Sequence, residues 1–264
     1  MTSQDPDTLD RQRRWWHRAR VPLRLVDPDA DDFASGGLAS RVSQPSVRLL
    51  LLPADPEAWL LDFDSTFWGW WSQDSDDPTT GQPTRWGYEN LPTASAALRA
   101  VVVEESHLAR YVALYRNGAL EFELGEDGTY SFRDGSLRVF NLIIIVGRVR
   151  AALHLWTGIR ARLGLQGPAE LSLALRDTGK AALGGFAEGY VEPRPGMQVR
   201  CCPSQHLFIR RELWEWPEND ERQLALTFSI GGWLQDAWGI EERRFLAPYG
   251  PLQGQFDRSH YRWR

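Results

Sequence analysis

The stretch that decides the fold is Tyr111–Leu124, which reads YVALYRNGALEFEL. Two strand-like runs flank a central Asn-Gly pair, and these two residues tolerate the positive φ that a two-residue type I′ turn requires. Pairing across such a turn sets Tyr115 opposite Leu120 on an apolar face and leaves Glu121 and Glu123 on a more polar one. The sequence therefore predicts a β-hairpin that lays its apolar side on a core.

On both sides of this hairpin the chain alternates between strand-length apolar runs and helical patterns. The apolar runs bounded by Pro, Asp or Gly predict strands at 47–52, 58–63, 98–103, 171–175 and 206–214. Ser136 is a suitable N-cap and Gly164 a suitable C′ residue, so we expect one buried helix between them. Four arginines are expected on its outer surface: Arg148, Arg150, Arg160 and Arg162. A last helix begins in the acidic stretch after Pro217.

The order of these elements predicts an α+β fold rather than alternating βαβ units. We expect a mainly antiparallel sheet with two long helices packed on one side, plus a basic N-terminal helix. The predicted organisation is a basic helix and first strand at 1–26, a single α+β domain at 27–245, and an irregular basic and aromatic tail at 246–264.

The overall composition predicts a folded cytoplasmic protein. The chain has 264 residues and a net charge of −5, enough length for a proper hydrophobic core. Its two cysteines, Cys201 and Cys202, are adjacent and therefore poorly placed for a disulfide, which fits a reducing compartment. The N-terminus shows no signal-peptide pattern, and the charge-free stretch Val139–Gly147 is too short to cross a bilayer. We expect no membrane partner.

Both ends of the chain combine arginine with tryptophan. This suits nucleic acid, because phosphates take the charge and bases stack on the rings. Alternatively, the arginine stems simply cover tryptophan on a surface helix. The candidate nucleic-acid-binding residues are Arg11, Arg13, Arg14, Trp15, Arg18, Arg258, Arg262 and Arg264.

A second feature is the stretch DFDSTFWGWW at 62–71. Its first half fits the Asp-x-Asp-x-Thr pattern of haloacid-dehalogenase-like phosphatases, in which the first Asp attacks phosphorus and bound Mg²⁺ assists. On that hypothesis the catalytic residues are Asp62, Asp64, Thr66 and the single lysine of the chain, Lys180. The alternative is that both aspartates lie on the polar face of an edge strand. The phosphatase family has a parallel α/β sheet, which this chain does not predict.

The second half of this stretch holds four aromatic residues, Phe67, Trp68, Trp70 and Trp71. In an extended strand they alternate between both faces, so the strand is either covered on both sides or forms an interface. Core packing, a protein–protein interface and a stacking platform all remain open. We take the four residues as the candidate protein interface.

From Pro83 onward the segments resemble the C-terminal region of bacterial proteins that carry a Schlafen AlbA-like domain. The resemblance rests on the hairpin Tyr111–Phe122, the helical segment Ser136–Leu163, the leader and strand Leu165–Leu175, and the last segment His206–Gly239. The AlbA-like domain, to which the family's nucleic-acid function is assigned, is not seen in this sequence. The resemblance therefore implies an accessory or sensing module in bacterial genome or antiviral defence, and it transfers no catalytic residue.

Taken together, the residues predict a non-enzymatic binding or assembly module. Its partner is expected to be another protein chain, in a homo- or hetero-oligomer, with nucleic acid as the alternative. The five histidines are scattered without metal-ligand spacing, and no Cys-x-x-Cys occurs. We expect no metal and no cofactor.

Overall fold

The computed structural model describes residues 46–54, 60–72, 75–76, 83–84, 95–96, 100–105, 110–124, 128–131, 137–184 and 201–240. The predicted N-terminal helix, the first strand and the C-terminal tail lie outside these residues. The same holds for every arginine and tryptophan proposed there to bind nucleic acid.

The main sheet has seven strands in the order β12-β10-β1-β7-β6-β5-β4, and each neighbouring pair is antiparallel. Its strands are β1 (Val47–Pro53), β4 (Ser95–Ala96), β5 (Ala100–Glu105), β6 (Arg110–Tyr115), β7 (Leu120–Leu124), β10 (Ala169–Arg176) and β12 (His206–Leu213). The interior strand β1 pairs with β10 and β7, so segments far apart in sequence are neighbours in the sheet.

Two smaller sheets and four helical segments complete the described part of the chain. A three-stranded sheet, in the order β11-β9-β8, consists of β8 (Thr129–Ser131), β9 (Arg138–Asn141) and β11 (Ala181–Gly184). A two-stranded sheet consists of β2 (Ser75–Asp76) and β3 (Pro83–Thr84). The helices are α3 (Ser65–Trp71), α4 (Leu142–Leu163), α5 (Asp220–Ala237) and the 3₁₀ turn η2 (Thr178–Lys180).

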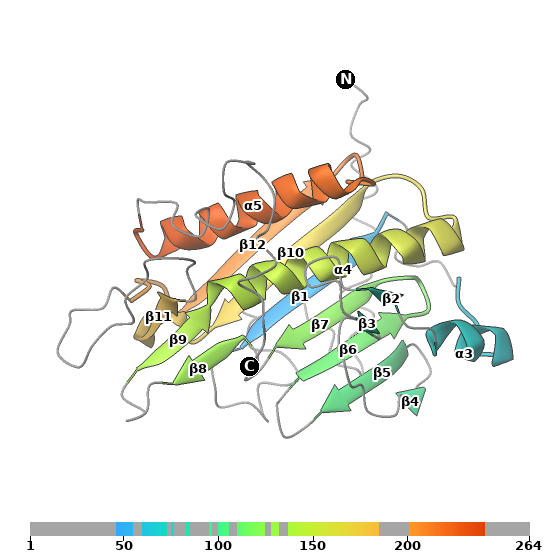
Figure 1. Ribbon diagram of the computed structural model, residues 1–264, viewed down its shortest axis with the longest axis horizontal. Coiled ribbons are helices and arrows are strands. Elements are labelled where there is room, and N and C mark those ends of the chain that lie inside the picture. The colour runs from blue at the N-terminus through green and yellow to red at the C-terminus, as the bar shows by residue number, and fades with distance from the viewer. Residues whose placement is uncertain are drawn as a thin grey trace.

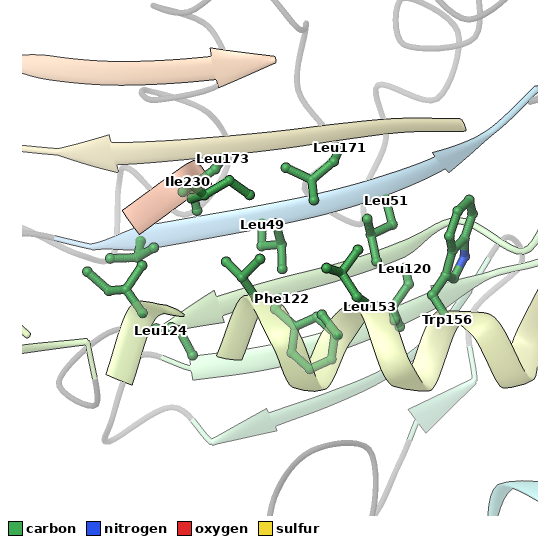
Figure 2. Packing of buried hydrophobic residues seen from close by; sticks show 14 of the residues in the cluster. Leu49, Leu51, Leu120, Phe122, Leu124, Leu153, Trp156, Leu171, Leu173 and Ile230 are labelled. Carbon is green, nitrogen blue, oxygen red and sulfur yellow. The ribbon is translucent and has the colours of Figure 1, made fainter. Parts of the chain in front are cut away.

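The two long helices, α4 and α5, lie side by side across one face of the main sheet (Figure 1). Leucines of the central strands point toward α4 and pack around Leu153 and Trp156 (Figure 2). Because side chains alternate along a strand, every second residue of β1, β7 and β10 joins this core. The α+β prediction, with a mainly antiparallel sheet and two long helices on one side, is confirmed.

The predicted hairpin exists, but its predicted register is wrong by one residue. The loop has three residues, since the Tyr115 N–H donates to the Ala119 carbonyl at 2.9 Å and Leu114 lies opposite Leu120. Gly118 adopts φ +81° at the end of this loop, as in a type I turn followed by a left-handed residue. A one-residue slip exchanges the faces of one strand relative to the other. Leu120, Phe122 and Leu124 of β7 join the core as predicted, but from β6 they are joined by Val112 and Leu114 instead of Ala113 and Tyr115.

Gly118 is the residue that this turn requires. We expect Gly118→Ala to destabilise the protein by at least about 1–2 kcal/mol, the usual cost of a left-handed residue with a Cβ atom. An added Cβ would also lie 3.0 Å from Leu165 Cδ1 and 3.1 Å from Leu163 Cδ1. Urea denaturation measures the change. Gly158→Ala is the matched control, because a Cβ there meets nothing within 4 Å and should stabilise helix α4 by about 0.5–1 kcal/mol. Equal effects of both substitutions would contradict this account.

Helix α4 begins later than predicted. The residues 138–141 form β9, and Asn141 caps the helix by accepting from the Ile144 N–H at 3.3 Å. The predicted end is confirmed, since Gly164 is the left-handed C-cap. The outward placement of Arg150 and Arg160 is wrong, because both side chains are buried. Arg150 reaches Asp220 at the start of α5, at 2.8 Å.

By length and composition alone, α4 is long and apolar enough to span a membrane, and it is the one such helix among the described residues. In this fold 56% of its apolar window is buried inside the protein, as in the core helix of a two-layer domain.

Candidate functional site

The aromatic stretch predicted as part of a strand forms the short helix α3 instead. Asp64 is its N-cap, and its Oδ1 atom accepts from the Phe67 N–H at 2.9 Å. Capping by Asp satisfies one of the free N–H groups at a helix start. The predicted strand at 58–63 is also wrong in its described part, since residues 60–63 have no regular structure.

The hairpin turn holds the segment that leads into α3. The Leu60 and Leu61 N–H groups donate to the Arg116 carbonyl at 2.8 and 2.9 Å. The Arg116 side chain donates to the Leu61 carbonyl at 2.7 Å and lies 4.0 Å above the centre of the Phe63 ring. These contacts fix α3 against the loop between β6 and β7.

The aromatic side chains of α3 divide into two groups. Phe67 and Trp71 are buried in the core, with their ring centres 5.6 Å apart. Trp68 and Trp70 are only partly buried and pack on Phe67, at ring distances of 5.3 and 5.6 Å. Arg162, exposed at the end of α4, lies 4.9 Å above the Trp70 ring. Two of the four residues predicted as a protein interface, Phe67 and Trp71, therefore belong to the core.

We define the α3 surface as Leu60, Asp62, Trp68, Trp70 and Arg162. Leu60 is 39% exposed, and the Asp62 side chain is 81% exposed while it pairs with Arg116 at 3.5 Å. This surface combines apolar rings with one charge of each sign, and it rests on buried side chains of the same helix.

The residues of the phosphatase hypothesis do not come together. Asp62 and Thr66 are exposed, and Asp64 is engaged as the cap of α3. Lys180 belongs to η2, next to β11, which lies at the opposite end of the sheet from α3 (Figure 1). A phosphoryl-transfer site needs these groups around one phosphate. Within the described ranges, no group of three or more His, Cys, Asp or Glu side chains is placed to hold a metal ion.

A second polar arrangement lies on the sheet face that points away from α4 and α5, which we call the polar face. Arg48 of β1 lies opposite Glu123 of β7 and donates to it from two nitrogens, at 2.8 and 3.0 Å. Arg48 also lies 3.7 Å from Glu121, which accepts from the Tyr115 hydroxyl at 2.8 Å. All three charged side chains are at most 1% exposed.

The polar face continues across β10 to β12. Glu170 accepts from the Ser172 hydroxyl at 2.9 Å and pairs with Arg210 of β12. Burial raises the pKa of Glu170, and the neighbouring Arg210 opposes this shift. Buried charges persist only when they are paired and hydrogen-bonded. The Arg48–Glu123 and Glu170–Arg210 pairs meet that condition.

Sequence reasoning placed Glu121 and Glu123 on a polar face but missed that this face is buried and includes Arg48. Glu121 and Glu123 alternate with leucine and phenylalanine in LEFEL, and such alternation is typical of a strand with one solvated face. The available signal was Arg48, a lone charge within the apolar run that forms the interior strand β1. A charge inside a buried strand needs a partner of opposite sign on a neighbouring strand.

A scan against protein-family models matched no family, and searches of curated proteins and of solved structures gave no match. The resemblance to the C-terminal region of Schlafen AlbA-like proteins stays a prediction.

Proposed function

We propose that this protein is a non-enzymatic assembly module that binds another protein chain through the α3 surface. The observation that carries the proposal is the division of one helix into anchored and exposed aromatic side chains. Phe67 and Trp71 fix the helix in the core, and Trp68 and Trp70 lie partly exposed above them. Aromatic side chains and arginine are the residues most enriched at protein interfaces.

Contacts within the protein hold the tryptophans of the α3 surface before any partner arrives. The Trp70 ring already packs on Phe67 and lies under Arg162. Little side-chain freedom is then lost on binding, and this lowers the entropic cost of association. Tryptophan and arginine in such positions often supply most of an interface's binding free energy.

The charges of this surface favour a second copy of the same chain as the partner. Arg162, in the last turn of α4, and Asp62, just before α3, are both exposed, and Asp62 also pairs with Arg116. In a two-fold contact the same patch meets itself, so a patch that carries both signs can pair each charge with its opposite on the other copy.

Light scattering on the purified chain at low and high salt tests this proposal. We expect an oligomer that persists at high salt, because its contact is mainly apolar. Trp70→Ala should weaken the association by about thirtyfold or more, as expected for an interface hot spot of 2 kcal/mol. Trp214→Ala is the matched control. Trp214 is also exposed, at 38%, but it follows edge strand β12, which two strands, β10 and β1, separate from the β6–β7 hairpin.

Two results would contradict the proposal. One is a wild-type monomer that carries nucleic acid until the salt is raised, which would favour the arginine-rich termini as the binding site. The other is an oligomer that Trp70→Ala and Trp214→Ala weaken equally.

A further inference from the structure

The aromatic cluster under the α3 surface is held between two arginines. Phe63 packs on Phe67 with ring centres 4.9 Å apart, and Phe67 in turn packs on Trp70 at 5.6 Å. Arg162 lies over this chain of rings at Trp70, and Arg116 lies over its other end at Phe63. Ring contacts therefore connect the exposed part of the cluster to the β6–β7 loop, which carries Arg116.

Arg116 also fixes the segment that leads into α3. Residues 60–63 have no regular secondary structure, and α3 has only seven residues. An isolated helix of this length is not stable, so its orientation depends on contacts with the rest of the protein. The Arg116 carbonyl accepts from the Leu60 and Leu61 N–H groups, and its Nη1 atom donates to the Leu61 carbonyl at 2.7 Å.

The exposure of Arg116 suits holding the α3 surface rather than touching a partner. Its side chain is 17% exposed, whereas that of Asp62, its ion-pair partner at 3.5 Å, is 81% exposed. Ion pairs at such exposed positions contribute little, so the Leu61 carbonyl and the Phe63 ring are the contacts that matter. A planar guanidinium can donate within its plane and stack its face on a ring at the same time, which an ammonium group cannot do.

We propose that Arg116 is a positioning residue for partner binding, which holds Trp68 and Trp70 in the orientation in which they meet the second copy. This inference rests on the proposed function. When the binding-competent orientation is only partly populated, the apparent affinity falls in proportion to its population. Loss of the Arg116 contacts therefore weakens the association although every residue of the α3 surface is still present.

Sedimentation equilibrium of the full chain measures this effect as a change in the dissociation constant of the oligomer. Arg116→Met should weaken the association by about tenfold, because a hydrogen bond from a charged group is lost and the competent orientation is less populated. Arg116→Lys keeps a cation and a donor and should weaken it less, by about threefold. Arg222→Met is the matched control. Arg222 is an exposed arginine on α5 that pairs with Glu215 at 3.4 Å, and its loss should leave the association unchanged.

Hydrogen exchange followed by mass spectrometry separates positioning from a general loss of stability. At a concentration at which both proteins are monomeric, peptides from residues 60–71 should exchange faster in Arg116→Met than in the wild type. Peptides from α5 should exchange equally fast in both, because only the local contacts are lost.

Three results would overturn the role of Arg116 while leaving the proposed function intact. In the first, Trp70→Ala weakens the association and Arg116→Met does not. In the second, Arg116→Met and Arg222→Met weaken it equally. In the third, residues 60–71 and α5 exchange faster by the same factor in Arg116→Met. A wild-type chain that stays monomeric would instead refute the proposed function, and this role of Arg116 with it.

Discussion

The Arg48→Met variant is expected to lose about 3–5 kcal/mol of unfolding free energy, because removing one partner of a buried ion pair leaves the other charge uncompensated. Arg48 is the cation between Glu121 and Glu123, at 3.7 and 2.8 Å, and all three side chains are at most 1% exposed. Methionine fills a similar volume, so the loss reports the charge rather than a cavity. Urea denaturation followed by tryptophan fluorescence measures it.

A double variant tests the electrostatic origin of this loss. In Arg48→Met/Glu123→Gln one of the two carboxylates is also removed, and we expect the double variant to be more stable than Arg48→Met alone. Arg211→Met, at an exposed position, should change stability by less than about 0.5 kcal/mol. If Arg48→Met proved as mild as Arg211→Met, the ion pairs of the polar face would contribute nothing to the fold.

The sequence predicted the hairpin but not the side of β6 that meets the core, and the reason lies in the turn. An Asn-Gly pair suits a two-residue type I′ turn and also a three-residue loop that ends in a left-handed glycine. Local sequence does not distinguish them. The choice comes from tertiary contacts: the Trp156 Nε1–H donates to the Gly118 carbonyl at 2.7 Å, and Leu163 and Leu165 pack on Gly118. That one residue exchanged the faces of β6 relative to β7, so Val112 and Leu114 rather than Ala113 and Tyr115 join the core.

The helix α3 was missed for a different reason, because its pattern was compatible with two periods. Read as a strand, the aromatic residues alternate between two faces. Read as a helix, Phe67 and Trp71 lie four residues apart and form one buried stripe. The deciding signal was Asp64, a preferred N-cap residue three positions before Phe67. The sequence analysis interpreted Asp64 as a catalytic candidate or as part of the polar face of an edge strand, and not as a helix cap.

The core itself was predictable, since it depends on hydrophobic periodicity over long segments. The run at 142–146 is β-branched but belongs to a 22-residue helix, and the helical spacing of the whole segment predicted it. The interior arginines of α4 were not predictable in this way. Arg150 and Arg160 are buried because α5 and the loop after α4 supply Asp220 and the Gly167 carbonyl as partners, and these come from distant or irregular parts of the chain.

Replacing Trp156 with alanine is expected to cost about 3–5 kcal/mol, the usual loss for a large buried aromatic side chain. Trp156 is fully buried, packs edge to face on Trp216 at 4.6 Å, and lies 5.2 Å below the Arg160 guanidinium. Its indole N–H also holds the hairpin turn at Gly118. The variant therefore loosens α4 from the hairpin that carries the α3 surface, and urea denaturation measures the loss.

Trp156→Phe separates packing from the hydrogen bond. Phenylalanine keeps most of the ring contact but cannot donate to the Gly118 carbonyl, so it should cost about 1–3 kcal/mol, the penalty for a buried polar group left without its partner. Trp214→Ala, at an exposed position, should stay within about 0.5 kcal/mol. If the phenylalanine variant were as stable as the wild type, the indole N–H would not fix the loop register. The three-residue turn would then depend on the packing of Leu163 and Leu165 against Gly118 alone.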